Sequence, residues 1–410
     1  MLARRSRSAF PGGLKLEGHK LHGEAGRIQP APLPARLILP LSQHIGTPAT
    51  PVVEVGERVR RGQLIASSDG FIAAPVHASS SGTVVDITEV AVPHPSGLDA
   101  PAIIIETDGL DERLPEAQCG AVADPFELEP AQLREKVRAA GLVGLGGAAF
   151  PSAVKLNPGS SAVVDTLILN GAECEPYISC DAALMSERAD EIIAGAELIR
   201  RNLGAHQCLI GIEDNAPQAA GAMRQAIIDA GYRQMQLKVV PTRYPQGGEK
   251  QLIQALTGLE VPSEGLPLNI GIVVHNVGTA AAIWRALKGG EPLTSRIVTV
   301  TGPGLKEPRN LDVRLGTPVA DLIAFCGGYT TPAPRLIMGG PMMGFHLHSD
   351  AMPVVKATNC ILVEAAESEP REPALPCIRC GDCVEVCPAG LLPQQLYWHA
   401  RAKEFDKAQK

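Results

Sequence analysis

Residues 163–176 read Val-Val-Asp-Thr-Leu-Ile-Leu-Asn-Gly-Ala-Glu-Cys-Glu-Pro. The first half, Val163–Leu169, is an apolar, β-branched run and predicts a buried strand. The second half, Asn170–Pro176, is polar and acidic, so it places ligand-binding side chains at the carboxyl end of that strand. Open α/β sheets bind their ligands at this edge. The stretch therefore predicts an α/β domain with a site at its strand ends.

The residues that follow repeat this pattern. Helical spacing of apolar residues alternates with strand-like runs through 189–203, 208–213, 216–230, 236–240, 251–257 and 270–274. Two more polar loops lie beside these elements, Tyr244–Lys250 before a helix and His275–Thr279 after a strand. Polar loops that recur at strand ends are typical of a nucleotide site in a parallel α/β sheet.

A glycine-rich string precedes the strand, Gly144-Leu145-Gly146-Gly147-Ala148-Ala149-Phe150-Pro151 with Lys155 beyond it. Glycines let backbone N–H groups close round a phosphate, which a Cβ would obstruct. A dinucleotide fingerprint follows a strand, however, whereas this string follows a helical segment, 130–140, that stops at Gly141. On the string alone, a structural turn and a phosphate site are equally consistent.

The flanking segments have β character. Residues 35–106 contain short apolar runs separated by glycine, proline and serine, and 55–66 and 74–84 resemble the two halves of a lipoyl/biotinyl-like barrel-sandwich hybrid. The tip between the halves, Ser67–Phe71, has no lysine, so we expect a structural or docking module and not a swinging-arm carrier.

From about Arg296 a β-β-α rhythm predicts a small grasp-like domain.

Near the end of the chain lies Cys377-Ile378-Arg379-Cys380-Gly381-Asp382-Cys383-Val384-Glu385-Val386-Cys387-Pro388. Its C-x2-C-x2-C-x3-C-P spacing is how bacterial ferredoxins hold a [4Fe–4S] cluster. Zinc sites usually use two separated hooks or Cys/His mixtures, and a disulfide framework needs denser cysteines and an export signal. The run therefore predicts iron–sulfur chemistry.

In two-cluster ferredoxins the fourth cysteine of each run binds the other cluster. One run is present here, so Cys377, Cys380 and Cys383 would hold three corners and Cys387, or a remote cysteine such as Cys360 or Cys326, the fourth. Residues 391–410 are expected to be a helix that would bring a second run back to the first. We therefore expect a truncated chain with low cluster occupancy.

Composition narrows the class of protein further. The chain has 410 residues, 45% hydrophobic content and a net charge of −7, which fits two to four globular domains. Its apolar runs are far shorter than the roughly 20 residues of a membrane helix. Without a basic stripe we expect no nucleic-acid partner. Met1–Ser8 is arginine-rich but has no apolar core after it, which indicates a disordered arm and not a signal peptide.

Several of these motifs together resemble one family. Gly144–Lys155 and Asn170–Pro176 resemble the glycine-rich and asparagine-acid loops of the NADH- and FMN-binding subunit of respiratory complex I. The whole chain is more similar to the C subunit of Rnf-type ion-translocating electron transport complexes. Phe10–Gly13 with His19-Lys20, and Ile210–Asn215, look like further signatures of that subunit.

The resemblance implies a multidomain α/β plus β fold with a barrel-sandwich hybrid, a complex I flavoprotein-like FMN/NADH domain, a β-grasp (SLBB-like) domain and a ferredoxin-like segment. The corresponding expected boundaries are an arm at 1–34 and domains at 35–112, 125–290, 291–365 and 366–410. The family carries two [4Fe–4S] clusters, whereas this chain has one cysteine run.

The resemblance also implies roles for individual residues. Gly144, Gly146 and Gly147 would donate backbone N–H groups to FMN, and Lys155 would meet its phosphate. Asn170 and Glu173 would hydrogen-bond the flavin, and Asn276 and Thr279 would close the site. The remaining expected contacts are Phe150 and Glu175 toward the nicotinamide nucleotide, Glu249 as the first glutamate of a Gly-Glu-Glu pattern, and Cys377, Cys380, Cys383 and Cys387 on the cluster.

Three positions depart from the complex I pattern. Leu145 stands in place of an arginine, Ala172 in place of an aspartate, and Lys250 in place of the second glutamate. These changes affect how a nucleotide would be oriented and how tightly FMN would be held.

The resemblance implies a peripheral subunit, on the cytoplasmic side of the cell inner membrane, of a ferredoxin:NAD⁺ oxidoreductase. It would exchange electrons between NAD(H), FMN and its clusters, with membrane and ferredoxin-like subunits as partners. The alternatives are a non-catalytic electron-transfer scaffold and the NADH-flavin module of a soluble hydrogenase or formate dehydrogenase. The A subunit of a sodium-pumping quinone reductase shares much of the architecture but should lack Cys377–Cys387.

Overall fold

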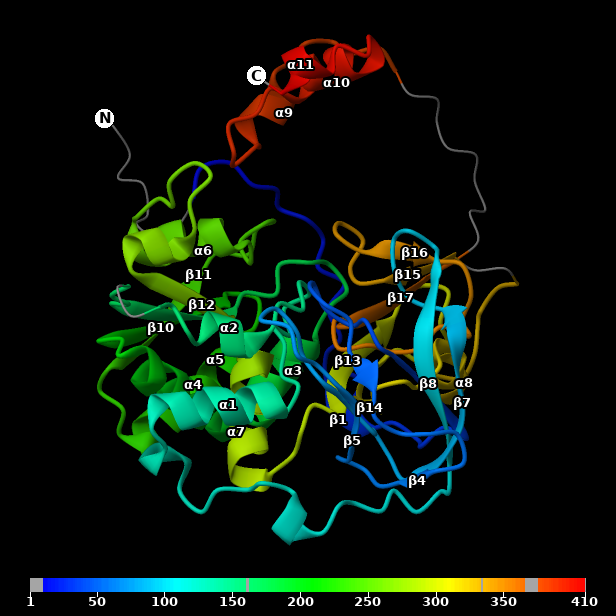
Figure 1. Ribbon diagram of the computed structural model, residues 1–410. Helices are drawn as coiled ribbons and strands as arrows, with labels where there is room; N and C mark the ends of the chain where they lie inside the picture. The colour runs from blue at the N-terminus through cyan, green and yellow to red at the C-terminus, as the bar shows by residue number, and fades with distance from the viewer. Residues whose placement is uncertain (1–9, 160–161, 333–334, 366–374, 410) are drawn as a thin grey trace.

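The structure, a computed structural model, describes residues 10–159, 162–332, 335–365 and 375–409 (Figure 1). The segment Met1–Ser8, expected to be an arm, and residues 366–374, at the start of the expected ferredoxin-like segment, lie outside the described residues. The elements in chain order are β1 Ile28–Pro30, β2 Arg36–Pro40, β3 Thr50–Pro51, β4 Arg58–Val59, β5 Leu64–Ser67, β6 Val76–His77, β7 Gly82–Ala91, β8 Asp99–Thr107, η1 Glu116–Gln118, η2 Pro125–Glu127, α1 Pro130–Ala139, α2 Ser152–Lys155, β9 Thr166–Gly171, α3 Cys180–Glu187, α4 Ala189–Leu203, β10 Gln207–Glu213, α5 Pro217–Ala230, β11 Met235–Val240, α6 Glu249–Thr257, η3 Pro267–Ile270, β12 Ile272–Asn276, α7 Val277–Gly289, β13 Ser295–Thr301, β14 Arg309–Arg314, α8 Val319–Phe325, β15 Arg335–Met338, β16 Phe345–Leu347, β17 Cys360–Glu364, α9 Asp382–Glu385, α10 Pro393–Arg401 and α11 Phe405–Ala408.

The α/β domain contains a parallel sheet with strand order β11-β10-β9-β12. Side chains of β9 alternate between two apolar layers: Leu167 and Leu169 join the large core shared with α4 and α7, and Ile168 joins a smaller core under α6. A strand covered on both faces needs an unbroken apolar run. This requirement explains the unbroken apolar run Leu167–Leu169 in the middle of β9.

The expected secondary structure of this domain is confirmed in order and type, and the strand bounds differ. The strand expected from Val163 begins at Thr166, because Val163 is 78% exposed and lies before the sheet. The same strand continues through Asn170 and Gly171, so Asn170 belongs to the strand end and not to the following loop. The strand expected over 270–274 is likewise shifted to Ile272–Asn276, with the short helix η3 before it.

The barrel-sandwich hybrid consists of the four-stranded sheet β2-β8-β7-β4 and the three-stranded sheet β3-β5-β6. Leu39, Val59, Ile65 and Ile103 are fully buried in it. The tip between its two halves is held in place, since Arg138 of α1 donates hydrogen bonds to the carbonyl oxygens of Gly70 and Phe71. A tip clamped in this way is unsuited to a swinging arm.

The β-grasp domain has a six-stranded sheet in the order β1-β14-β13-β17-β15-β16. Strand β1, from the expected N-terminal arm, pairs in parallel with β14. The N-terminal segment therefore adds an edge strand to a domain that begins more than 260 residues later in the chain. Figure 1 shows this sheet beside the barrel-sandwich hybrid, with the α/β domain on its other side.

The C-terminal segment is a set of short helices, α9 to α11, set apart from the other domains in Figure 1. The prediction of one helix over 391–410 is wrong, because two helices, α10 and α11, cover this stretch. Lys403, between them, has a left-handed φ of 58°. A left-handed residue of this kind ends a helix. Within the described residues, no helix combines the length and apolar character needed to cross a bilayer.

Lys356 joins three domains at their common junction. It lies between β16 and β17 of the β-grasp domain and is 1% exposed. Its Nζ donates to the carbonyl oxygens of Pro75 at 2.7 Å and Gly141 at 2.8 Å. Pro75 belongs to the barrel-sandwich hybrid and Gly141 to the α/β domain. Burial lowers the pKa of Lys356 from its ordinary value of 10.5 to about 7. The buried junction of the three domains therefore favours the neutral form of the Lys356 amine.

This pKa shift predicts how stability depends on pH. Between about pH 7 and about pH 10.5 the unfolded chain binds more protons at Lys356 than the folded chain does, so stability rises with pH in this window and the gain is lost as pH falls toward 7. We expect the unfolding free energy of the wild type minus that of Lys356→Met to rise by about 1.4 kcal/mol per pH unit. Urea unfolding across this window measures the slope. The exposed Lys306→Met is the control and should give a pH-independent difference.

Candidate functional site

The carboxyl edge of the parallel sheet is the place where polar side chains converge. From β9 the chain passes to β10 and β11 on one side, whereas β12 pairs with β9 on the other. The strand order therefore changes direction at β9. Such a change of direction opens a crevice outside the carboxyl ends of the strands, where α/β sheets bind ligands. Asn170 at the end of β9 and Asn276 at the end of β12 are direct partners across the sheet. The two predicted residues therefore lie side by side at the crevice.

The glycine-rich loop forms a hairpin over this edge. Val143 and Pro151 pair at its base, and the backbone N–H of Gly144 donates to the carbonyl of Phe150 at 2.8 Å. Gly147 has a φ of 109°, which side-chain-bearing residues rarely adopt. A Cβ added to Gly146 would lie 3.3 Å from Cβ of Asn276. The glycines thus let the loop backbone approach the strand ends closely.

Two side chains hold the loop in position through Leu145. Its backbone N–H donates to Oγ1 of Thr279 at 2.9 Å, and its carbonyl accepts from Nη2 of Arg296 at 3.0 Å. Asn276 caps α7, because its Oδ1 accepts from the backbone N–H of Gly278 at 2.8 Å. The glycine-rich loop and the N-terminus of α7 are therefore one hydrogen-bonded unit.

The acidic loop connects to the same unit through α3. Oε1 of Glu173 accepts from the backbone N–H of Asp181 at 2.9 Å, and Asp181 accepts in turn from Nδ2 of Asn276 at 2.6 Å. The pKa of Asp181 is raised to about 7, mainly by burial and secondly by the nearby negative charge of Glu173. No motif in the sequence indicated a role for Asp181.

Glu173 and Asp181 form a compact group with Cys180, and their ligand atoms all lie within 4.8 Å of one another. Carboxylate and thiolate groups at this spacing can bind a metal ion. Here Glu173 and Asp181 already accept the hydrogen bonds described above, and burial raises the pKa of Cys180 well above its ordinary value. The contacts of this group support the loop geometry.

Lys155 and Glu249 meet on the other side of the crevice. Nζ of Lys155, on α2, lies 2.9 Å from Oε1 of Glu249 and donates to the carbonyl of Val274 at 3.0 Å. Glu249 opens α6, and Nδ2 of Asn170 donates to the carbonyl of Gly247, two residues earlier, at 2.8 Å. Both members of the ion pair are more than a third exposed. The ammonium group can therefore turn to an anion at low cost in stability.

Glu175 is turned away from the other predicted residues. Oε2 of Glu175 accepts from the backbone N–H of Met342 at 3.1 Å, and a Cβ at Gly340 would lie 2.2 Å from the same oxygen. Burial raises the pKa of Glu175. Phe150 contributes its carbonyl to the base of the glycine-rich loop. The structure therefore brings the three glycines together with Asn170, Glu173, Asn276 and Thr279. It pairs Lys155 with Glu249 on the other side of the crevice. Glu175 instead contacts the β-grasp loop that contains Gly340 and Met342.

Lys20 holds the acidic loop, a contact that was not predicted although the His19-Lys20 pair stood out in the sequence. Its Nζ donates to the carbonyl oxygens of Glu173 at 2.6 Å and Glu175 at 2.9 Å, and to that of Ile178. His19 stacks on Tyr177, with ring centroids 4.6 Å apart. The N-terminal segment thus fixes the shape of the acidic loop.

A buried carboxyl group also lies at this edge. Glu213, at the end of β10, is 1% exposed, and burial raises its pKa to about 7. Within the described part of the chain, Oε1 of Glu213 and both side-chain polar atoms of Gln246 have no hydrogen-bond partner. Glu213 belongs to the Ile210–Asn215 motif, but no role for it was predicted from the sequence.

The cysteine run lies on the loop around α9. Cys377, Cys380 and Cys383 are exposed, Cys387 is half-buried, and all four are free. The run is anchored at Val386, whose carbonyl accepts from the backbone N–H of Gly13 at 2.8 Å. The remote candidates for a fourth ligand, Cys326 and Cys360, are fully buried in the β-grasp domain. This burial leaves Cys387 as the suitable fourth thiol.

The residues present fit both cofactors that the sequence analysis expected. A glycine-rich hairpin with Gly147 at a φ of 109° and Gly146 close to Asn276, beside a capped helix N-terminus and the partly exposed Lys155, is suited to the phosphate of FMN. Four free thiols with Gly381 in a left-handed conformation, φ 90°, are suited to a [4Fe–4S] cluster.

Family profiles match three consecutive parts of the chain. Residues 8–110 match the RnfC barrel sandwich hybrid domain, 137–285 the Nuo51 FMN-binding domain and 297–346 the SLBB domain. The fold and the site therefore define a complex I flavoprotein-like module joined to a barrel-sandwich hybrid and a β-grasp domain.

Curated relatives identify the family. The chain is 45% identical to the C subunit of the ion-translocating oxidoreductase complex of Rhodobacter capsulatus, over 97% of this chain and 76% of that protein. It is 49% identical to the protein of the same name from Pseudomonas aeruginosa, over 97% of this chain and 51% of that protein. The chain belongs to the family formed by the C subunits of ion-translocating oxidoreductase complexes. It spans about half the length of the Pseudomonas relative.

A solved structure supports the fold. An NAD⁺-reducing [NiFe]-hydrogenase in the H2-reduced state aligns with a TM-score of 0.51 and 22% sequence identity, over 61% of this chain and 49% of that one. At this identity the alignment supports a shared fold.

Proposed function

We propose that this chain binds FMN and NAD(H) at the carboxyl edge of its parallel sheet and exchanges electrons with a [4Fe–4S] cluster on Cys377, Cys380, Cys383 and Cys387. The observation that carries the proposal is the glycine-rich loop, which Thr279 fixes over Asn170 and Asn276 where the strand order reverses. FMN, when bound, accepts a hydride and releases electrons singly.

The residues of the crevice have separate tasks in this proposal. Gly144, Gly146 and Gly147 offer backbone N–H groups, and the N-terminus of α7 adds its dipole toward a phosphate. Lys155 supplies a point charge. Asn170 fixes the end of β9 to the carbonyl of Gly247, and Glu173 fixes the start of α3 through the backbone N–H of Asp181. Glu249, at the start of α6, closes the edge of the crevice.

The N-terminal segment links this edge to the cluster loop. Leu14 pairs with Tyr244, directly before the loop that carries Glu249, and Gly13 is bonded to Val386 beside Cys387. Gly12 permits this approach, because a Cβ there would lie 2.7 Å from the carbonyl oxygen of Val386. One short segment therefore contacts both redox sites.

At the level of the complex, we propose a peripheral subunit on the cytoplasmic side of the inner membrane. It would work in ferredoxin:NAD⁺ oxidoreduction coupled to ion transport, with membrane and ferredoxin-like subunits as partners. The name of the relatives and the barrel-sandwich hybrid at residues 8–110 support this assignment over a soluble hydrogenase or formate dehydrogenase module.

Anaerobic reduction of the FMN-reconstituted chain by NADH tests the proposal. We expect rapid loss of the visible flavin absorbance. If FMN binds and NADH does not bleach it, the chain is a non-catalytic scaffold. If FMN does not bind, the assignment of the crevice is wrong.

Lys155→Gln is expected to weaken FMN binding about tenfold, because it removes one charge-assisted contact to the phosphate. The partly exposed Lys155–Glu249 pair predicts a stability loss below about 1 kcal/mol. Fluorescence titration of FMN measures the affinity. The control is Lys306→Gln, an exposed lysine of the β-grasp domain outside the crevice, which should bind FMN as the wild type does. Equal affinities of the two variants would remove Lys155 from the site.

A further inference from the structure

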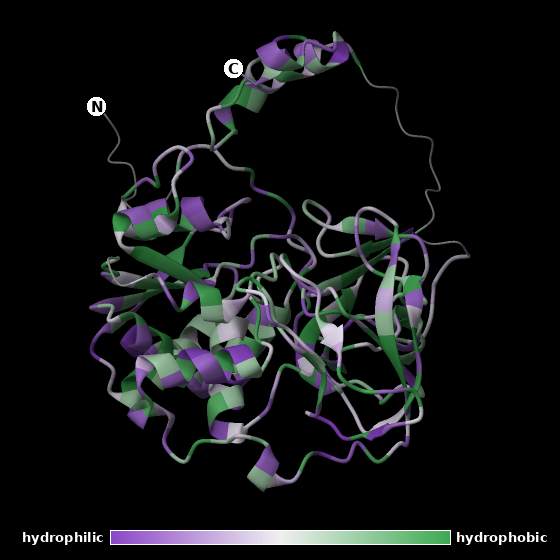
Figure 2. Ribbon diagram, viewed as in Figure 1, coloured by the Kyte–Doolittle hydropathy of each residue, from purple (hydrophilic) through white to green (hydrophobic). Residues whose placement is uncertain are grey.

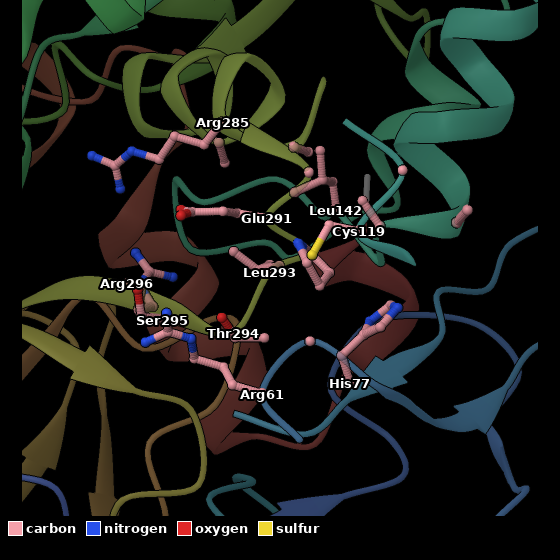
Figure 3. A pocket seen from close by; sticks show the side chains of 18 of the residues that line it. Arg61, His77, Cys119, Leu142, Arg285, Glu291, Leu293, Thr294, Ser295 and Arg296 are labelled. Atoms are coloured by element: carbon pink, nitrogen blue, oxygen red, sulfur yellow. The ribbon is translucent and has the colours of Figure 1, made fainter. Parts of the chain in front are cut away.

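A large cavity lies where the barrel-sandwich hybrid, the α/β domain and the β-grasp domain meet (Figure 3). Its volume is about 1370 Å³, with walls from β4 and β5, α1, α7 and the start of β13. Ligand pockets commonly have volumes of about 300–1,000 Å³. Most of it lies outside the crevice described above, and it shares a wall with the crevice at Leu145, Asp181, Gly278 and Arg296.

The walls of this cavity are basic, although the chain as a whole carries a net charge of −7. Nine arginines and one lysine line it, against six carboxylates, and two further carboxylates, Asp108 and Asp111, pair with Arg58, Arg61 and Arg314. Arg61 and Arg314 share a single carboxylate, that of Asp111, so this part of the wall carries a net positive charge. Arginine is the side chain best suited to bind phosphate through two parallel hydrogen bonds.

Two arginines in the wall have nitrogen atoms that no other group uses. Arg296 is 6% exposed; two of its nitrogens donate to the carbonyl oxygens of Leu145 and Lys356, and its Nε has no partner among the described residues. Arg285 donates from Nε to Glu191 at 2.5 Å, and its Nη2 is likewise buried without a partner in the described chain. A buried donor without a partner costs free energy. Both atoms have almost no accessible surface, so each side chain would have to turn toward the cavity to bind a ligand there.

The cavity also has an apolar side. Leu142 and Leu293 line it, together with Ala281 and Ala282 of α7. In the view of Figure 3, Arg285, Arg296 and Arg61 lie on one side, and His77 and Leu142 on the other. A cavity that combines arginines with apolar side chains suits a ligand with an anionic end and a flat apolar end.

We propose that this three-domain cavity binds a nucleotide carrying two or more phosphates, with the phosphates on Arg61, Arg285 and Arg296 and the base against the apolar wall. This site is separate from the proposed flavin and nicotinamide site. It requires all three domains, so the ligand would bridge them at their junction.

Cys119 provides a local probe, because it is free and lines the cavity. The full chain is incubated with FMN and excess NADH, which fill the crevice, and then alkylated with iodoacetamide with ATP, tripolyphosphate or adenosine present. Peptide mapping by mass spectrometry reports each cysteine. We expect ATP to slow alkylation of Cys119 at least fivefold and adenosine to have no effect, with Cys377 as the exposed internal reference.

Calorimetry of ATP binding under the same conditions tests the arginines. Arg285→Gln and Arg61→Gln are each expected to weaken binding about tenfold, whereas the exposed Arg224→Gln on α5 should not change it. The side chains of Arg285 and Arg61 are 25% and 23% exposed, so both variants should fold. Lys155→Gln should also bind ATP as the wild type does.

Three results would overturn the proposal. The first is the absence of protection at Cys119. The second is ATP binding that survives both arginine variants but is lost in Lys155→Gln, which would assign it to the crevice. The third is protection by phosphatidylglycerol vesicles and not by ATP, which would identify the phosphate ligand as a lipid.

Discussion

Lys20→Met is expected to lower FMN affinity at least tenfold and the unfolding free energy by about 4.5 kcal/mol or more. The ammonium group donates to three carbonyl oxygens of the acidic loop, and its side chain is 13% exposed. Each hydrogen bond to a charged group contributes roughly 1.5–3 kcal/mol, and methionine keeps the apolar stem while removing all three. FMN titration and urea unfolding give the two values.

The matched control is Lys15→Met, five positions earlier in the same segment, where the side chain is exposed. Because this change removes the same charge without touching the acidic loop, both FMN affinity and stability should stay at wild-type values. If Lys20→Met loses stability but keeps its FMN affinity, Lys20 only supports the fold. If it loses neither, the three carbonyl contacts do not set the loop geometry.

Much of the α/β domain could be predicted because its local signals agree with one another. Helix α4 begins and ends at the expected residues, 189 and 203, since its apolar spacing is helical and Gly204 ends it with a left-handed φ of 66°. Hydropathy along the ribbon in Figure 2 shows the same agreement, with apolar residues concentrated in the strands of the sheets. The cofactor-binding roles of the glycines and Asn276 come from the family resemblance and stay predictions, while the structure places Gly146 beside Asn276 at the strand ends.

The parts of the site that were missed depend on contacts between distant residues. Lys20 reaches Glu173 across 153 positions, and Arg296 reaches Leu145 across 151. Nothing in the local sequence of a lysine or an arginine specifies such a partner. Glu175 was placed toward the nicotinamide by resemblance, and its contact with Met342 depends on how the β-grasp domain packs against the acidic loop.

Gly340 shows how closely those two domains approach each other. A Cβ at this position would overlap the carboxylate of Glu175, at 2.2 Å from Oε2. The absence of a side chain at Gly340 therefore permits the contact, and a sequence alone does not show which glycines have this function.

Cys383→Ser is expected to abolish assembly of the cluster in the anaerobically reconstituted chain, because a [4Fe–4S] cluster at this motif needs all its thiolates. Iron content should fall to near zero, and no reduced-cluster signal should appear by electron paramagnetic resonance after NADH is added. NADH should still bleach the bound flavin, since the run touches the N-terminal segment through Val386 and not the crevice. Cys119→Ser, outside the run, should keep its iron.

A second variant separates loss of the cluster from loss of contact with it. Gly12 has a φ of 76°, and a Cβ there would lie 2.7 Å from the carbonyl oxygen of Val386, so Gly12→Val should push the cysteine run away from the N-terminal segment. We expect this variant to retain its iron and its flavin bleaching, while the cluster signal after NADH develops at least tenfold more slowly. Wild-type kinetics in Gly12→Val would mean that electrons do not pass by way of this contact. Full iron content in Cys383→Ser would move the cluster to other ligands.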